Sequence, residues 1–209
     1  MMKIEHIAAS PDRAGRYTLR FEDGSSMRLY RQTVEDFSLY AGLEMDGEQL
    51  EKLRAAAGQM SAKMRAVRIV SASSISKREL ERRLVQKGED PKQAQEAVKW
   101  MSDLNLVDDA KTAEQIVHSC IHKGYGLARA KQALYEKRIP KEFWEDALAD
   151  YPEQEDKILE FLRAKLSADA DEKAVKRAID ALLRRGHRYG QIRKALEQLH
   201  FDAEEFPED

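Results

Sequence analysis

Three copies of one short pattern constrain this chain more than any other feature of its sequence. Aligning the chain with itself places Ser74, Gly124 and Gly186 at one equivalent position. Apolar residues then recur six and ten residues later in every copy: Leu80, Ala130 and Ile192, followed by Leu84, Leu134 and Leu196. A helix-ending residue followed by apolar residues at helical spacing predicts a turn and then a short amphipathic helix. We therefore expect repeated helical units that bury their apolar faces against one another.

The spacing of these copies and the composition of the flanking segments predict the domain organisation. Residues 1–30 alternate between apolar and polar positions around Glu22-Asp23-Gly24, a hairpin signal, and predict a small antiparallel sheet of two or three strands. The interval from Leu84 to Leu134 is 50 residues and that from Leu134 to Leu196 is 62, so extra residues are expected around 152–172. The expected segments are an N-terminal part with strands and short helices (1–58), three three-helix repeats (59–107, 108–153 and 154–201) and an acidic tail (202–209).

The predicted fold class is therefore mainly α: a tandem array of three three-helix repeats, elongated and curved, with a small N-terminal β-hairpin or sheet plus helices. The longest apolar runs are only a few residues, whereas a membrane span needs about 20. The start of the chain lacks an apolar signal core, and a single cysteine, Cys120, cannot form an internal disulfide. We expect a soluble, cytoplasmic monomer.

Charge is separated along the chain although the net charge is only −2. Residues 173–194 contain eight lysines and arginines against one acid, whereas residues 141–160 contain eight acids against two lysines. Blocks of this kind indicate separate basic and acidic surfaces. The alternative is that charge-rich helices only keep a small helical protein soluble.

The order of several motifs resembles the RecX family, bacterial regulatory proteins that bind the RecA recombinase. The matching segments are Ser76-Lys77-Arg78-Glu79-Leu80 through Leu84 and Lys87-Gly88; Leu106-Val107-Asp108-Asp109 with Ala113; Lys123-Gly124-Tyr125-Gly126 through Leu134 and Ile139; and Leu182-Leu183-Arg184-Arg185-Gly186 through Ile192. Ala130, Arg138 and His187 depart from the residues common in that family. The resemblance implies an array that lies in the groove of a RecA filament on DNA and damps strand exchange, ATP hydrolysis and co-protease activity in DNA repair and the SOS response.

Candidate catalytic and metal-binding residues all have a simpler structural interpretation. His118 and His122 have the i, i+4 spacing of a zinc-binding pair, but no glutamate follows His118 and no paired cysteine motif accompanies them. Cys120 lies on an apolar stripe and is interpreted as a packing residue. Asp108-Asp109 suits the start of a helix better than a catalytic carboxylate pair. We therefore expect no enzymatic activity, no cofactor and no metal.

Basic residues on the repeated helices are the candidate sites for contact with RecA or DNA. Arg78 and Arg82 fall opposite Leu80 and Leu84 on a helical wheel, and Tyr125 lies beside basic residues where it could stack on bases. The complete candidate set is Lys77, Arg78, Arg82, Lys123, Tyr125, Arg129, Lys131, Arg184, Arg185, Arg188, Arg193 and Lys194.

Three hypotheses remain at this stage. The first is a non-enzymatic regulator of the RecA filament. The second is a helical-repeat protein that binds single- or double-stranded DNA without recombinase contact, for which binding should fall steeply with salt. The third is a scaffold for some other protein. Tyr125 at a turn and the basic clusters also have a structural interpretation, as a packed aromatic and a solvated face.

Overall fold

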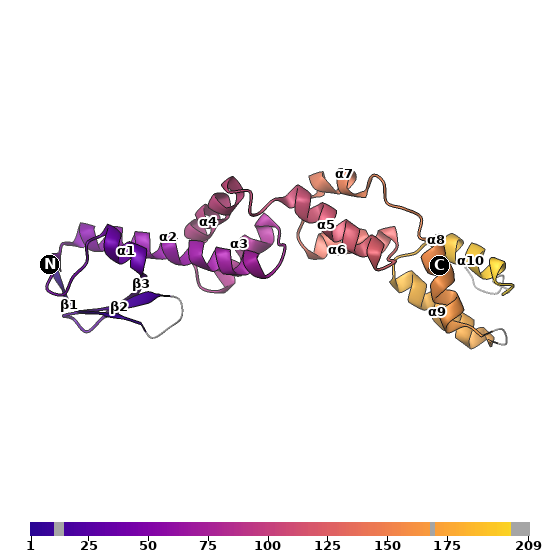
Figure 1. Cartoon of the computed structure of the whole chain (residues 1–209), viewed down its shortest axis with the longest axis horizontal. Coiled ribbons are helices and arrows are strands. Elements are labelled where there is room, and N and C mark those ends of the chain that lie inside the picture. The colour runs from indigo at the N-terminus through magenta and orange to yellow at the C-terminus, as the bar shows by residue number, and fades with distance from the viewer. Residues whose placement is uncertain (11–14, 168–169, 202–209) are drawn as a thin grey trace. The chain divides into compact units, whose positions relative to one another are not determined.

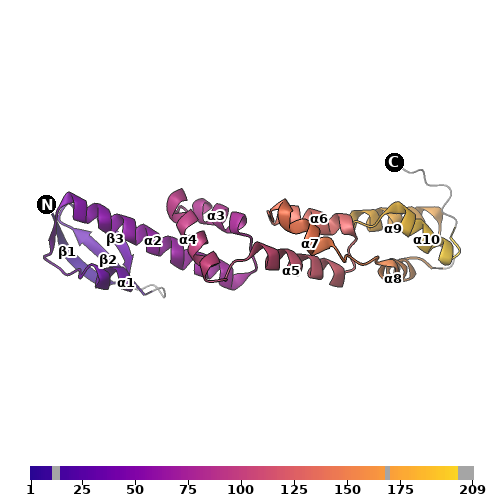
Figure 2. The same cartoon turned by 90° about the horizontal axis from the view of Figure 1, so that it is seen from above.

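The computed structural model describes residues 1–10, 15–167 and 170–201, so the expected acidic tail (202–209) lies outside the described residues. The chain divides into two compact units, one comprising Met1–Val107 and the other beginning at Asp108 (Figure 1). The same elements are seen from above in Figure 2. The predicted class, mainly helical with a small N-terminal sheet, is confirmed.

In its described residues, the first unit combines a sheet with four helices. Its strands are β1 (Met2–Ala9), β2 (Arg16–Phe21), β3 (Ser26–Tyr30) and β4 (Glu44–Met45). Its helices are α1 (Arg31–Asp36), α2 (Gly47–Ala72), α3 (Lys77–Gln86) and α4 (Pro91–Asp103). The second unit contains α5 (Asp109–His122), α6 (Leu127–Glu136), the 3-10 helix η1 (Lys141–Phe143), α7 (Trp144–Leu148), α8 (Glu155–Lys165), α9 (Glu172–Arg184) and α10 (Tyr189–Gln198).

The N-terminal sheet is antiparallel, with strand order β3-β2-β1-β4. The predicted hairpin joins β2 and β3, and Asp23 accepts hydrogen bonds from the backbone N–H and the hydroxyl of Ser25 at 2.9 and 2.6 Å. Ile4, Leu19 and Leu29 are buried with Leu53 of α2 in one apolar cluster. The fourth strand was not predicted, because a two-residue strand is too short for an alternation to show.

Helix α2 connects this sheet to the first repeat. Asp46 caps it through a capping box with Gln49, at 2.8 and 2.9 Å. The helix continues through Gly58, so the domain boundary expected after that residue falls inside one helix. Its C-terminal half buries Ala62 and Ala66 against α3 and α4, and these small side chains allow the helices to approach closely.

The second repeat buries Ala113 and Val117 of α5 with Leu134 of α6 and Ile139. Its third helix, expected as one helix from Lys141, is divided into η1 and α7. The Trp144 indole N–H donates a hydrogen bond to the Ile139 carbonyl at 3.0 Å, which holds this segment on the α5–α6 pair.

The third set of helices explains the uneven repeat spacing. Helices α9 and α10 correspond to the first and second helices of the earlier repeats, because Gly186 and Ile192 lie at the equivalent positions. Helix α8 precedes this pair and packs on both members, with Ile158 and Leu162 fully buried among their apolar residues. The extra residues expected around 152–172 largely form this helix, which precedes α9 in the sequence.

Among the described residues, seven helices, α1, α3, α4, α5, α6, α9 and α10, end in the same turn. In each, a residue with positive φ follows the C-cap, and the next backbone N–H donates to the carbonyl five residues before it, as in a Schellman motif. The positive-φ residues of these turns are Ser38, Gly88, Asn105, Gly124, Arg138, Gly186 and His200. The sequence signal at Gly124 and Gly186 therefore marks this turn, whereas at the first copy, near Ser74, helix α2 ends in extended backbone. Arg138, with φ 57°, adopts the conformation in which glycine is normally favoured.

Candidate partner-binding surfaces

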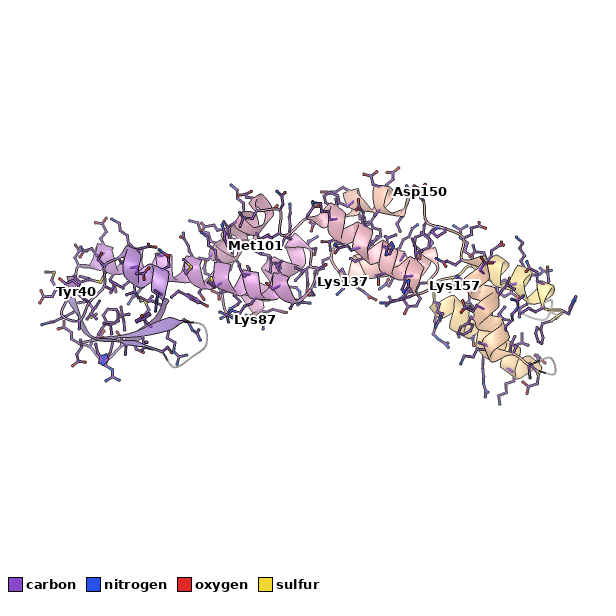
Figure 3. The ribbon with its side chains drawn as sticks, in the orientation of Figure 1. Tyr40, Lys87, Met101, Lys137, Asp150 and Lys157 are labelled. Atoms are coloured by element: carbon purple, nitrogen blue, oxygen red, sulfur yellow. The ribbon has the colours of Figure 1, made fainter. Side chains whose placement is uncertain are left out.

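The twelve candidate residues lie in three places. Lys77, Arg78 and Arg82 lie on α3 in the first unit. The other nine lie in the second unit, around the α5–α6 turn and around the α9–α10 turn. The C-cap lysines Lys87 and Lys137 are also exposed, at the ends of α3 and α6 (Figure 3).

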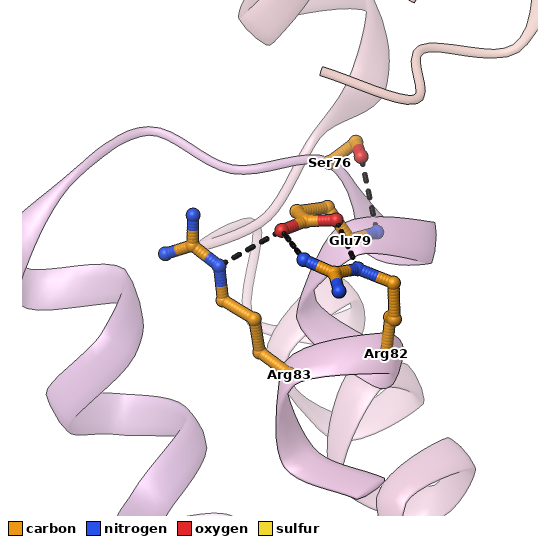
Figure 4. A network of polar contacts seen from close by, with 4 residues as sticks. All are labelled: Ser76, Glu79, Arg82 and Arg83. Atoms are coloured by element: carbon orange, nitrogen blue, oxygen red, sulfur yellow. Dashed lines mark hydrogen bonds and ion pairs between the residues drawn. The ribbon is translucent and has the colours of Figure 1, made fainter. Parts of the chain in front are cut away.

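On α3, the arginines are organised by one buried carboxylate. Arg82 donates from Nε and Nη2 to the two oxygens of Glu79 at 2.7 and 2.6 Å, and Arg83 donates from Nε to Glu79 Oε1 at 2.9 Å (Figure 4). The Glu79 side chain is only 8% exposed, whereas those of Arg82 and Arg83 are 38% and 39% exposed. The hydroxyl of Ser76 caps the helix by accepting the Glu79 N–H at 3.2 Å. Arg82 is therefore half-buried and already paired with Glu79, whereas Arg78, which the helical wheel places on the same face, is exposed.

These arginines lower the pKa of Glu79 to about 2, mainly through the hydrogen bonds from Arg82 and against the opposing effect of burial. The carboxylate is therefore ionised across the physiological pH range. Together with two arginines it forms a group of net charge +1 with a fixed geometry.

Around the α5–α6 turn, Lys123 and Lys131 are exposed, while Tyr125 and Arg129 are half-buried. Arg129 forms an ion pair with Glu136 at 3.0 Å, which raises the pKa of the guanidinium and lowers that of the carboxyl. The backbone carbonyl of Tyr125 accepts a hydrogen bond from the Tyr151 hydroxyl at 2.6 Å.

Around the α9–α10 turn, Arg184 and Arg188 are exposed, while Arg185 is half-buried. The Arg185 guanidinium lies 4.8 Å from the centre of the Phe161 ring and 6.0 Å from that of Tyr125, within the range of cation–π contacts. On α10, Arg193 pairs with Glu197 at 2.9 Å and Lys194 pairs with Glu155 of α8 at 2.7 Å. The densest basic cluster of the sequence is thus divided between exposed and internally engaged side chains.

The two glycine turns of the second unit interlock. The Gly126 N–H donates to the Arg185 carbonyl at 2.9 Å, and the Ala128 N–H donates to the Gly186 carbonyl at 3.3 Å. A Cβ atom on Gly126 would lie 2.0 Å from the Gly186 oxygen, and one on Gly186 would lie 2.2 Å from the Arg129 nitrogen. The first N–H groups of α6 thus bond the last carbonyls of α9, so each helix end satisfies the other.

His187 makes a further hydrogen bond between the same two turns. Its Nε2 lies 3.0 Å from the Gly124 carbonyl, and because a carbonyl only accepts, this nitrogen carries the proton. Burial lowers the pKa of His187, and burial raises the pKa of Tyr151 to about 12. Lys131 and Arg188 line a hollow of about 300 Å³ beside this junction.

The residues considered for catalysis or metal binding have other roles in the described part of the chain. Cys120 is buried, and burial raises the pKa of its thiol. Asp108 caps α5 by accepting the N–H groups of Ala110 and Lys111 at 3.0 and 3.2 Å. His118 and His122 are exposed on α5, and no group of three or more possible metal ligands occurs among the described residues. Over the same residues, no helix combines the length and the apolar character that crossing a bilayer requires.

Sequence reasoning missed Glu79, Arg83 and Tyr151 as parts of these surfaces. Glu79 is followed by arginines at i+3 and i+4, a spacing that predicts side-chain pairing on a helix and was a usable signal. Tyr151 contacts a residue 26 positions away, for which the sequence offers no local signal. Three-helix units joined through repeated turns, with cations on those turns, define the chain as a helical-repeat protein.

Comparison with known proteins agrees with this class. Residues 108–148 match the family model described as RecX, second three-helix domain. Regulatory protein RecX of Vibrio parahaemolyticus is 28% identical over 145 residues, covering 66% of this chain and 90% of that protein. Regulatory protein RecX of Streptococcus gordonii is 25% identical over 197 residues, covering 92% and 76%. A crystal structure of regulatory protein RecX shares the fold, with a TM-score of 0.62 at 19% identity over 96% of this chain and 99% of that one. The chain is therefore similar to RecX regulatory proteins in sequence and shares their fold.

Proposed function

We propose that this chain binds RecA filaments on DNA and modulates their activity, most simply by inhibiting strand exchange, ATP hydrolysis and co-protease activity. Similarity to the RecX family carries the proposal, because the motif resemblance implies RecA as the partner. In this proposal the chain acts as a cytoplasmic monomer, without catalysis, cofactor or metal.

Exposed cations on the second unit support a charged contact surface. Lys123, Lys131, Arg184 and Arg188 are exposed, and charges of one sign on a surface steer association with an oppositely charged partner. Arg185, by contrast, is engaged between two rings, so its replacement would disturb the fold as well as the surface. Arg184 and Arg188 are therefore the better positions at which to test binding.

The test is RecA's single-stranded-DNA-dependent ATP hydrolysis, titrated with this protein at fixed salt. We expect turnover to fall at less than one molecule per recombinase protomer. Arg184→Glu combined with Arg188→Glu should shift the titration to higher concentration. Lys173→Glu combined with Lys176→Glu is the matched control, because it reverses two exposed charges elsewhere on α9 with the same change in net charge.

The alternatives give different results. If turnover falls only when the protein covers the DNA before RecA is added, competition for DNA explains the effect and the second hypothesis replaces the first. Unchanged turnover at every ratio would contradict any modulation of RecA ATPase, and it would leave a scaffold for another protein as the remaining hypothesis. Equal effects of both charge-reversal pairs would show that net charge, rather than the α9–α10 turn, governs binding.

A further inference from the structure

We infer that the Glu79-Arg82-Arg83 triad of α3 is a preorganised binding site for the phosphodiester backbone of DNA, in which Glu79 is the positioning residue. Both guanidinium groups converge on one carboxylate, as Figure 4 shows. The inference concerns bare DNA, so it does not depend on recombinase binding.

Preorganisation is the first step of the argument. A long arginine side chain normally loses rotamer freedom when it binds, and this loss of entropy opposes binding. The bidentate contact with Glu79 already fixes Arg82, and the Nε contact already fixes the direction of Arg83. Because the Glu79 side chain is only 8% exposed, the carboxylate is anchored to the helix and not mobile in solvent.

Donor capacity is the second step. Arg82 uses Nε and Nη2 for Glu79, and Arg83 uses Nε, so the Nη1 group of Arg82 and both Nη groups of Arg83 remain outside the contacts with Glu79. The Arg83 Nη groups turn away from the carboxylate in Figure 4. Guanidinium N–H groups match phosphate oxygens in geometry and charge, and such charge-assisted bonds are about twice as strong as neutral ones.

The surroundings on α3 favour a polyanion over a single ion. Arg78 is exposed one turn before Arg82, and four residues of helix advance about 6 Å along the axis. Lys77 is exposed beside it, and Glu81 accepts a hydrogen bond from Gln95 of α4 at 3.1 Å. Helix α3 therefore presents Arg78 and Arg82 one turn apart with Arg83 on the adjoining face, which suits the repeating charge of a nucleic-acid backbone and gives contacts without base specificity.

Glu79→Gln distinguishes positioning from simple charge. If only charge mattered, removing a negative charge would tighten DNA binding. If Glu79 positions the arginines, Glu79→Gln should weaken binding by about fivefold, as expected from releasing two ordered side chains. The matched control is Glu197→Gln, which removes an exposed carboxylate from the Arg193 pair on α10 and should leave DNA binding unchanged or tighter.

The measurement is fluorescence anisotropy of labelled single-stranded and duplex DNA over a range of salt, with circular dichroism to establish that α3 is folded. We expect Arg82→Gln to reduce the slope of log K against log salt by about 0.7 for single strands, whereas Glu79→Gln lowers affinity with the slope retained. Arg82→Lys combined with Arg83→Lys keeps the charge and a cation beside Glu79, and it should weaken binding through loss of the guanidinium donors alone.

Three results would overturn the inference. If the Glu79→Gln variant is folded and binds DNA as tightly as wild type, Glu79 does not position the arginines for binding. Polyglutamate that competes as well as DNA at equal charge makes an acidic protein the ligand instead. If the wild-type protein does not bind bare DNA at low salt, the proposed site does not exist. This result can be distinguished from that of the RecA assay, which measures ATP turnover.

Discussion

Gly126→Ala should separate the second repeat from the third, because it places a methyl group inside the interlocked turns. Gly126 has an ordinary negative φ of −76°, so alanine meets no backbone strain there. The added Cβ would instead lie 2.0 Å from the Gly186 oxygen and 2.5 Å from the His187 nitrogen. Because both are backbone atoms, the two turns must move apart.

The magnitude follows from the hydrogen bonds that cross this junction. Those from Gly126 to Arg185, from Ala128 to Gly186 and from His187 to Gly124 are each worth about 0.5–1.5 kcal/mol net. Replacing glycine by alanine also stabilises the protein by about 0.4–1 kcal/mol, because it restricts the conformations of the unfolded chain. We expect a net loss of about 0.5–4 kcal/mol in the free energy of unfolding, concentrated in the third repeat, since repeat proteins can unfold unit by unit.

The assay is urea unfolding together with hydrogen exchange, in which the amide of Ala128 should lose protection. Gly190→Ala is the matched control, because it lies in α10 of the same unit and its added Cβ meets no atom within 4 Å. There alanine should stabilise the protein by up to about 1 kcal/mol. The reasoning is refuted if Gly126→Ala also stabilises, or if protection at Ala128 is unchanged.

Three further predictions concern the second unit. Arg138→Gly should raise the urea midpoint by the equivalent of up to about 1 kcal/mol, because φ is 57°; a lower midpoint would contradict this. Burial lowers the pKa of His187, so its contribution to stability is present above the unfolded pKa of about 6.5 and is lost as pH falls below that value. Between pH 7.5 and 5, the melting temperature should therefore fall less for His187→Phe than for wild type. Leu134→Ala should cost about 2–5 kcal/mol in urea unfolding, whereas Tyr135→Ala, at a position 68% exposed, should change stability by less than about 0.5 kcal/mol.

Much of the fold could be predicted from the sequence because its signals are local. The turns at Gly124 and Gly186 and the helix start at Asp108 each depend on residues within one helical turn. The two-residue strand β4 and the break of the third helix into η1 and α7 were missed, since both depend on packing against distant segments.

The candidate surfaces were harder to predict, because pairing decides which cations are available. Arg82 pairs with a neighbour on its own helix, and the charge spacing there could have shown it. Lys194, in contrast, pairs with Glu155 at a separation of 39 residues, and Arg185 lies against Phe161 and Tyr125 from other helices. The sequence composition does not distinguish these cations. Their contacts in the folded chain decide which of them are engaged internally and which are exposed.

The position of α8 gives the junction between the second and third repeats a second connection. A Cβ on Gly124 would lie 3.1 Å from the Lys157 side chain of α8, so α8 passes close to the turn whose carbonyl His187 binds. The chain thus leaves the second repeat through α8 and returns to the same turn through the α9–α10 connection. Two sets of contacts, from different parts of the third repeat, converge on Gly124, Tyr125 and Gly126. A partner that binds the exposed cations beside this turn therefore contacts two repeats held as one body, and binding there does not have to order them first.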